Sequence, residues 1–491
     1  MEDQIVYEDW EPVIGLEIHA QLNTRTKLFS GSPNHFGDEP NTNIGVVDTG
    51  QPGSLPILNR EAVRKAVQFG CAVHANIALF STFDRKSYFY PDSPRNFQIT
   101  QFYHPILEGG FVVADVNEET KRFALQQAHL EDDSGMLKHF SQFAGIDDNR
   151  AGVPLIEIVS KPCIHSPKEA SAYAMAIKAI LQYINASDGN MEKGSLRIDC
   201  NISVRKKSEK TLRTKVEIKN INSFSYMELA IEAEIRRQIR EYSLHPHEDP
   251  SSIIEQGTYR FDAEKKELIL MRKKEKVMDY RYCPEPDLPS LMLTQQEIDE
   301  LRSSLPELPH ARLKRYISQY GIPQNGASLL VNEKKLADFF EEALRYCSHA
   351  KSLCNWMTVE FAGRLKNSGH SLLSIGISPL HIGKLVSMIE KGIITGKIAK
   401  SIADLMVLHP LKDPEEILRE NPDFQPIDAT TQIDPLVDQV LAAHPQSIRD
   451  YHAGKGRAFD FLVGQVMKLC KGKASPNIVN ELLSNKLKKL S

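Results

Sequence analysis

Three short stretches of the chain alternate apolar and polar residues with a period of two, which is the side-chain period of a β-strand. They are residues 13–19, 197–204 and 214–219. One side of each stretch holds Ile, Leu, Val or Cys. The other side carries mostly charged or amide-bearing residues: Glu17, His19, Arg197, Asp199, Asn201, Ser203, Lys215, Glu217 and Lys219. A solvated antiparallel sheet shows the same alternation, but the mixture of Asp, Asn, His and Arg favours a polar, concave sheet surface that holds something charged.

A fourth stretch, 147–162, has a related design. A polar turn leads through Gly152 and Pro154 into the apolar run 155–159, whose β-branched residues and Gly/Pro borders predict a strand. Glu157 interrupts this run, and a carboxylate in a buried strand is costly unless it is paired or lies near a cation. An edge strand with Glu157 facing water is the alternative.

Helical periodicity follows these strands. Asn59 is the expected N-cap of a helix that reaches Cys71, and 166–169 (Ser-Pro-Lys-Glu) is a capping box before apolar positions at helical spacing. A third helix is predicted from Ser223 to Ile239. Strands followed by long helices predict an α+β fold in which helices back the apolar side of an antiparallel sheet.

The composition changes near the proline-rich segment 284–289, after which the pattern is almost only helical. A polar, proline-containing segment, 412–434, predicts a linker. The expected helices are 297–304, 311–320, 336–347, 353–367, 379–391, 398–407, 446–453, 458–469 and 476–489. We therefore expect an N-terminal cradle-like domain at 1–293, an all-α domain at 294–410 and a small helical tail domain at 411–491.

Composition sets limits on the class of protein. With 491 residues the chain is too long to form a single hydrophobic core. Its 41% hydrophobic and 25% charged residues, without any apolar run of membrane-spanning length, indicate a soluble globular protein. Seven scattered cysteines without a CxxC pair, and a start that lacks a signal peptide, fit the cytoplasm. The net charge of −4 means that any nucleic-acid contact must be local.

A local basic surplus is found at the end of the chain. Between residues 452 and 491 only Asp460 and Glu481 oppose the cations Lys455, Arg457, Lys468, Lys471, Lys473, Lys486, Lys488 and Lys489. Such a surplus is typical of a surface that contacts a phosphate-bearing partner. A solubilising helical tail is the alternative.

Two further segments carry candidate chemistry. In 84–92 two cations precede three aromatic residues, a combination that can neutralise phosphate and stack on a nucleobase. The alternative is a turn followed by a strand with buried aromatic residues. In 129–135 a histidine precedes three acids; these ligand types suit Mg²⁺ or Mn²⁺ better than zinc, whereas a solvated loop is the alternative.

Several blocks together resemble one family, the B subunits of aspartyl/glutamyl-tRNA amidotransferases (GatB/GatE). The resemblance covers essentially the whole chain, with one departure at Cys283, where an aromatic residue is expected. The blocks are 13–19, 83–92, 146–162, 194–199, 217–224, 279–282, 454–456 and 462–465.

This resemblance implies an ATP-dependent carbon–nitrogen ligase. Such a protein activates the side-chain carboxylate of Glu or Asp mischarged on tRNA(Gln) or tRNA(Asn), and ammonia then displaces the phosphate. The implied cofactors are ATP and Mg²⁺. The implied metal ligands are Glu17, His19, Asp132 or Glu131, and Glu217.

The resemblance also assigns roles to other residues. Lys86 and Arg197 would neutralise phosphates, with Arg85 and Tyr88 as further cofactor-binding residues. Asp199 and Glu157 would position the substrate or the ligands. The implied nucleic-acid contacts are Lys455, Arg457, Lys468, Lys471 and Lys473.

The chain lacks a Gly-Gly-Ser-Ser amidase stretch, so the resemblance implies a glutaminase partner, GatA, and a small third subunit, GatC. A non-catalytic tRNA-binding scaffold is the alternative function. Clustered ligand-type residues such as Glu17 and His19 argue against it.

Overall fold

The computed structural model describes residues 7–117, 119–219, 221–262, 265, 267–273, 280–424, 430–470, 473–474 and 476–489. The chain forms two compact units, residues 1–312 and 313–491. Helix α5 (Gln295–Ser303) belongs to the first unit, and its Ile298 is buried in that unit's core. The three-domain division at 293 and 410 stays a prediction.

The first unit is built around one large sheet, in the strand order β15-β14-β13-β12-β1-β11-β8-β6-β2, with β7 paired to β8 outside this path. All neighbours in it are antiparallel except β13 and β14, which are parallel. Its strands are β1 (Trp10–Gln21), β2 (Asn76–Ile77), β6 (Leu107–Glu108), β7 (Phe111–Val116), β8 (Glu119–Asp132), β11 (Pro154–Ser160), β12 (Leu196–Lys206), β13 (Val216–Lys219), β14 (Gly257–Asp262) and β15 (Glu267–Lys273).

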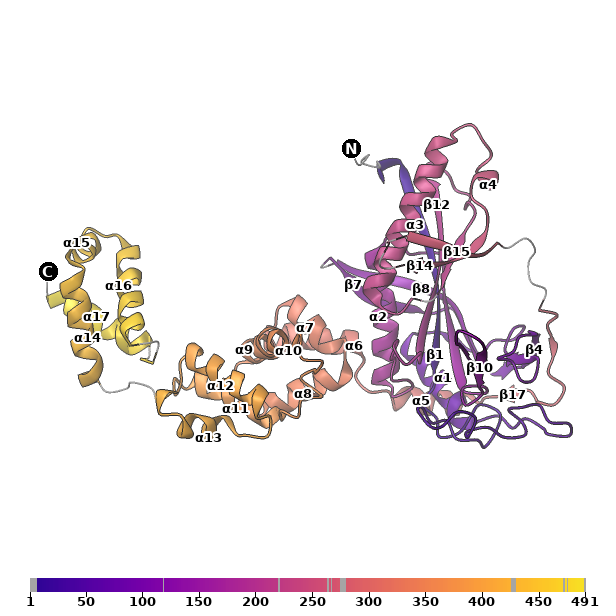
Figure 1. The fold of residues 1–491 in the computed structure, drawn as a ribbon, viewed down its shortest axis with the longest axis horizontal. Helices are drawn as coiled ribbons and strands as arrows, with labels where there is room; N and C mark the ends of the chain where they lie inside the picture. The colour runs from indigo at the N-terminus through magenta and orange to yellow at the C-terminus, as the bar shows by residue number, and fades with distance from the viewer. Residues whose placement is uncertain are drawn as a thin grey trace. The chain divides into compact units, whose positions relative to one another are not determined.

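Helices cover one face of this sheet. Figure 1 shows α2 (Pro167–Tyr183) and α3 (Phe224–Leu244) along that face, where α1 (Arg60–Ala72) also packs. The apolar sides of the strands point to these helices, and residues such as Ile14, Leu16, Ile198 and Ile202 are fully buried. The expected α+β arrangement, with helices backing the apolar side of the sheet, is confirmed.

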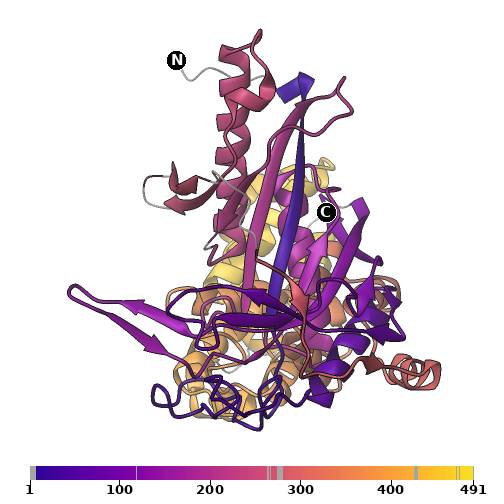
Figure 2. The same ribbon diagram turned by 90° about the vertical axis from the view of Figure 1, so that its right-hand side faces the viewer.

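Smaller sheets lie beside the large one. They are formed by β16 (Cys283–Pro284), β4 (Asp84–Ser87) and β5 (Phe97–Thr100), by β9 (Met136–His139) and β10 (Ala144–Asp147), and by β17 (Leu291–Met292) and β3 (Phe80–Ser81). Figure 1 shows β4, β10 and β17 on the side of the large sheet that α2 and α3 leave free. Figure 2 looks from that side, with β1 (indigo) in the middle of the sheet.

The expected helix starts of the first unit are confirmed. Asn59 and Ser166 are N-caps whose side chains accept hydrogen bonds from backbone N–H groups of the first turn, and Ser223 caps α3 in the same way. The capping box at 166–169 differs in one detail, because the Glu169 carboxylate accepts from the N–H of His165 instead of that of Ser166.

The second unit is helical, as expected, and holds two separate hydrophobic clusters, one within residues 313–418 and one within 433–487. The bounds are α6 (Pro309–Tyr320, which begins in the first unit), α7 (Gln324–Val331), α8 (Lys334–Leu344), α9 (Ala350–Asn355), a π-helical turn η2 (Trp356–Phe361), α10 (Ala362–Leu365), α11 (Pro379–Glu390), α12 (Gly396–Leu408), α13 (Pro414–Glu420), α14 (Thr430–Ala443), α15 (Pro445–His452), α16 (Gly456–Leu469) and α17 (Pro476–Lys489). Short elements elsewhere are η1 (Tyr7–Asp9), α4 (Pro250–Ile253) and η3 (Pro422–Phe424).

Two expectations for the second unit are corrected. The segment 412–434 is not a plain linker: it contains α13 and the start of α14, because Asp413 caps α13 and Ile417 enters the core. The expected helix 353–367 contains the π-helical turn η2. Among the described residues, no helix is both long and apolar enough to cross a membrane.

Candidate active site

Five neighbouring strands, β13-β12-β1-β11-β8, present their polar sides on the sheet face opposite to α2 and α3. Register brings residues from four of these strands into one row. His129 of β8 pairs with Glu157 of β11, Glu157 with His19 of β1, and His19 with Arg197 of β12. The expected polar sheet surface therefore exists, and the edge-strand alternative for Glu157 is excluded because β11 lies between β1 and β8.

The first cluster at this surface contains His19, Glu131 and Glu157, whose ligand atoms lie within 4.8 Å of one another. His19 Nε2 lies 3.3 Å from Glu157 Oε2 and 3.8 Å from Glu131 Oε1. His129 Nε2 lies 3.5 Å from the same Glu157 oxygen and 3.9 Å from Glu131 Oε2. Two carboxylates and two imidazoles thus alternate around a small space.

The charges in this cluster are strongly coupled. Burial alone would lower the pKa of His19, but Glu157 and Glu131 outweigh it and raise the pKa to about 9. Burial would raise the pKa of Glu157, yet His129 and His19 hold it well below its usual range. Glu131 Oε2 is buried and receives no hydrogen bond from any residue that the structure describes. A buried carboxylate oxygen without a donor suits a bound cation.

A second cluster lies beside the first and contains Glu17, Asp199 and Glu217, again with ligand atoms within 4.8 Å of one another. Burial and the neighbouring Glu157 and Asp199 raise the pKa of Glu17. Lys219 Nζ bridges two members of the cluster, at 2.9 Å from Asp199 and 3.3 Å from Glu217. The cluster therefore concentrates negative charge on one side of β1 and holds one protein cation against it.

Both clusters have the chemistry of a site for a hard divalent cation. Mg²⁺ and Mn²⁺ prefer oxygen ligands, and a cation between the carboxylates would offset both the burial and the repulsion that raise the pKa of Glu17. Of the expected ligands, Glu131 and His19 join the first cluster, and Glu17 and Glu217 join the second. Glu157 and Asp199, expected as positioning groups, complete the two sets.

Asp132, the other acid considered with Glu131, lies apart from both clusters. Adjacent residues of a strand point to opposite faces, so its carboxylate faces away from His19. It pairs with Arg95 and accepts a hydrogen bond of 2.8 Å from the N–H of Ile99. Asp132 thus anchors β5.

Lys86 reaches the first cluster from β4. Burial would lower its pKa, but Glu131 and Glu157 outweigh burial and raise the pKa, which keeps the ammonium charged. Its Nζ also lies over the ring of Tyr280, 5.2 Å from the ring centre. The fold therefore brings Lys86 beside Glu131 and Glu157 of the first cluster.

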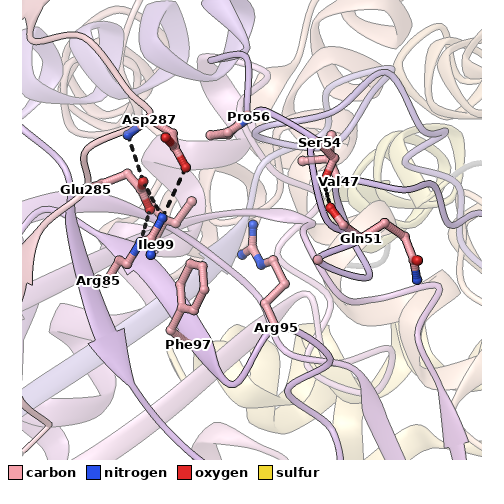
Figure 3. A pocket seen from close by; sticks show the side chains of 11 residues that line it. Val47, Gln51, Ser54, Pro56, Arg85, Arg95, Phe97, Ile99, Glu285 and Asp287 are labelled. Atoms are coloured by element: carbon pink, nitrogen blue, oxygen red, sulfur yellow. Dashed lines mark hydrogen bonds and ion pairs between the residues drawn. The ribbon is translucent and has the colours of Figure 1, made fainter.

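Arg85, the neighbour of Lys86, points the other way. Its guanidinium donates to both carboxylate oxygens of Glu285, at 2.7 and 2.9 Å, and to Asp287 at 3.2 Å. Figure 3 shows these contacts in a pocket of about 200 Å³ that Phe97 and Arg95 also line. Arg85 faces away from Lys86, because the strand period separates the two side chains, and its expected role in cofactor binding stays a prediction.

Arg197 and Tyr88 complete the expected set. Arg197 Nη2 lies 2.9 Å from the buried Asp133 Oδ1, which is also near Arg150, and Arg197 remains about one-third exposed at the row of His19. Tyr88 stacks on Tyr90 with ring centres 5.7 Å apart. The alternative for segment 84–92 was a turn followed by a strand with buried aromatic residues. This expectation is wrong for Phe89, which is 72% exposed.

The described residues among the expected nucleic-acid contacts lie in α16 or next to it. Arg457 and Lys468 are exposed on α16. Lys455 pairs with Asp450 at 3.1 Å and Lys473 with Asp423 at 3.2 Å. Lys471 lies outside the described residues. Their contact with RNA stays a prediction.

Three residues of the site received no individual role from the sequence: His129, Asp133 and Lys219. His129 and Asp133 belong to the candidate ligand segment 129–135, and a strand extended through that segment would have placed His129 on the face of Glu131. The period of two placed Lys219 on the polar side of β13 with Glu217, but it did not show that Lys219 bridges Asp199 and Glu217.

A hollow of about 460 Å³ continues the site beyond Glu17. Its lining is mixed: Gly15, Ser160, Asn201, Ser203 and Lys215 lie in it beside apolar residues, which are Val13, Leu16, Val159, Pro162 and Leu212. No heavy atom lies within 4 Å of a β-carbon built on Gly15, so this position keeps the hollow open.

Comparisons with known proteins agree with this geometry. The model of the GatB/GatE catalytic domain matches residues 12–299, and that of the GatB domain matches 338–487. The chain is 64% identical to the B subunit of the aspartyl/glutamyl-tRNA(Asn/Gln) amidotransferase of Protochlamydia amoebophila, over 99% of the chain and 98% of the relative. It is 57% identical to the protein of the same name in Chlamydia pneumoniae, over 99% of both. The chain therefore belongs to the GatB family of tRNA-dependent amidotransferase subunits, which are ligases of protein biosynthesis.

Proposed function

We propose that the chain uses ATP to activate the side-chain carboxylate of Glu-tRNA(Gln), Asp-tRNA(Asn) or both, and that ammonia then converts the activated group to the amide. The observation that carries this proposal is the juxtaposition of two ligand clusters with Lys86. Phosphoryl transfer requires little covalent chemistry from a protein, but it requires cations placed around the transferred group.

The bonds change in two steps. A carboxylate oxygen of the aminoacyl group attacks the γ-phosphorus, and the bond between that phosphorus and the leaving ADP oxygen breaks. The nitrogen of ammonia next attacks the carbonyl carbon of the acyl phosphate, and the C–O bond to phosphate breaks. The products are the amide, ADP and inorganic phosphate.

The residues of this chain have distinct roles in that reaction. The cluster of His19, Glu131 and Glu157 and that of Glu17, Asp199 and Glu217 would hold Mg²⁺, which supplies charge neutralisation for the phosphates. Lys86 adds a fixed positive charge beside the first cluster, and Arg197, oriented by Asp133, adds another in the same row. The hollow beside Glu17 has the volume of a small-molecule pocket and a mixed polar and apolar lining, which supports it as the place for a nucleoside.

We further infer that ammonia comes from a glutaminase partner. The names of the relatives describe one subunit of an amidotransferase, which supports a complex with GatA and GatC. The chain also lacks the Gly-Gly-Ser-Ser stretch of an amidase. Because its substrate is an aminoacyl-tRNA, we place the reaction in the cytoplasm.

The test follows the γ-phosphate. The assembled complex is incubated with γ-labelled ATP, Mg²⁺ and Glu-tRNA(Gln) or Asp-tRNA(Asn), without any ammonia source. We expect label on the aminoacyl group, and its loss as phosphate when ammonium is added. Amide formation without label transfer would contradict the proposal, and a complex that binds tRNA but never consumes ATP would indicate a scaffold.

A further inference from the structure

An aromatic ledge lies next to the site, formed by Phe102, Tyr103 and Tyr282. The rings of Phe102 and Tyr282 are stacked, with centres 3.9 Å apart and planes inclined by 10°. Tyr103 meets Phe102 edge to face, with centres 5.0 Å apart and planes at 82°. Residues that are far apart in the chain thus form one surface.

The ledge is open to solvent. Phe102 is 50% exposed and Tyr103 is 54% exposed, whereas the core aromatic residues Phe69 and Tyr173 are fully buried. Exposed apolar surface of this kind is costly in water and, when contiguous, marks a place where another molecule binds.

The ledge is also held rigidly. The backbone N–H groups of Phe102 and Tyr103 both donate to Asp84 Oδ2, at 2.9 and 3.1 Å, and Asp84 is only 1% exposed. On the other side, the N–H of Ser87 donates to the carbonyl of Tyr280 at 2.9 Å. Asp84 and Ser87 are the ends of β4, the strand that also carries Lys86. One strand therefore fixes the ledge and Lys86 relative to each other.

The ledge adjoins the first cluster. Lys86 Nζ lies over Tyr280, whose ring centre is 6.0 Å from that of Tyr282. Tyr280 thus connects Tyr282 of the ledge to Lys86, the cation beside the first cluster.

We propose that this aromatic ledge stacks the base of the 3′-terminal nucleotide of the tRNA, and so brings the aminoacyl group to Lys86 and the first cluster. This inference rests on the proposed function, because that function makes an aminoacyl ester of the terminal ribose the substrate. The terminal base and the aminoacyl group are then attached to the same ribose. Aromatic faces bind unpaired bases at the ends of RNA strands by stacking.

The ledge is assigned to tRNA and not to the adenine of ATP because of its position and openness. The hollow beside Glu17 borders the second cluster, whereas the ledge borders the first cluster through Lys86. A nucleotide in the hollow and a tRNA end on the ledge would approach the two clusters from different sides. The open ledge suits a strand end that arrives from solvent.

The test uses binding without ATP, so it does not depend on the activation chemistry. Affinities of the assembled complex are measured for uncharged tRNA with an intact 3′ end and for the same tRNA without its terminal adenosine. For the natural sequence we expect a preference for the intact tRNA of about tenfold, the scale of one base–aromatic stack. Phe102→Ala should reduce this preference to less than about twofold, whereas Phe102→Trp should retain it.

Tyr226→Ala is the matched control, since Tyr226 is 46% exposed on α3, on the opposite side of the sheet, and its loss should leave the preference unchanged. Thermal unfolding of each variant verifies the fold. If Phe102→Ala keeps the preference but raises KM for ATP, the ledge binds the nucleotide and the inference is wrong. An unchanged preference and an unchanged KM also overturn it. Failure of the proposed function itself would show separately, as absent label transfer in the natural complex.

Discussion

Glu131 and Asp132 are neighbours in the chain, yet one faces His19 and the other anchors β5. The same holds for Lys86 and Arg85, of which only Lys86 faces the site. At the scale of single residues, the strand period therefore divides each charged pair into one side chain that faces the site and one that is held in an ion pair away from it.

The first prediction concerns His19. His19→Ala removes the imidazole that lies between Glu157 and Glu131, so we expect loss of phosphoryl transfer by at least about a hundredfold, while glutamine hydrolysis by the complex persists. Label transfer from ATP and glutamate release are measured side by side. His165→Ala, an exposed histidine that contacts the carbonyl of Pro12, is the control. Normal amide formation by His19→Ala at low Mg²⁺ would exclude His19 from the site.

The second compares Lys86→Ala with Arg85→Ala. Lys86→Ala should lower phosphoryl transfer by orders of magnitude with little change in tRNA affinity, because a fixed charge beside the transferred group is lost. Arg85→Ala should leave phosphoryl transfer in place but destabilise the fold by about 2 kcal/mol, because the buried Glu285 loses its two charged hydrogen bonds. Rates and unfolding midpoints of both variants separate the two roles. Loss of tRNA binding with intact ATP use in Lys86→Ala would assign Lys86 to the RNA surface.

At the scale of elements, the turn 147–153 before β11 ties the loop 27–49 to the sheet. The N–H of Asp148 donates to Asn41 at 2.7 Å, and that of Asn43 donates to Asn149 at 2.7 Å. The fully buried Lys27 lies 3.7 Å from Asp48. The turn that leads into the strand of Glu157 is thus built into a loop from the start of the chain.

Gly152 is a position in this turn where a side chain has no room. Its φ is +83°, and an added β-carbon would lie 2.8 Å from Asp48 Oδ1 and 3.2 Å from Lys27 Cδ. Gly152→Ala should therefore destabilise the protein by about 2–3 kcal/mol, through backbone strain and displacement of the Lys27–Asp48 pair.

Gly194→Ala is the control for this prediction, since Gly194 has a φ of +75° and no atom within 4 Å of an added β-carbon. For Gly194→Ala we expect the free energy of unfolding to fall by about 1 kcal/mol, from the backbone conformation alone. Denaturant unfolding measures both variants, and equal losses would show that the contact with Asp48 is unimportant.

At the scale of the whole molecule, the last helices have a hydrophobic cluster of their own. The cluster includes Ile433 of α14 and Leu487 of α17, and the preceding cluster of the second unit ends at Leu418. Lys455 and Lys473 pair with acids at the protein surface, where ion pairs are weak and screened by salt, so these cations remain available to phosphates.

Truncation after residue 424 should therefore weaken tRNA binding and flatten its dependence on salt, because fewer phosphates are neutralised. Truncation near residue 434 would divide α14, so residue 424 is the better end point for the truncated chain. ATP and Mg²⁺ binding should survive, since the sheet has its own core. Salt titrations compare the truncated complex with a full-length variant in which Lys455, Arg457 and Lys468 are changed to Gln. If the slope is unchanged in both, the basic tail does not contact RNA.

The sequence alone determined the strands β1, β11, β12 and β13, the caps of α1, α2 and α3, and the face on which the polar side chains of those strands lie, because all three depend on spacing along a short segment. It could not determine which strands are neighbours. His19, Glu157, His129 and Arg197 form one row only because β12, β1, β11 and β8 pair in this order and register. Pairing depends on how the whole apolar side of the sheet is buried against α1, α2 and α3, so the tertiary structure decided that Glu131 and not Asp132 joins His19, and that Phe102 stacks on Tyr282 beside Lys86.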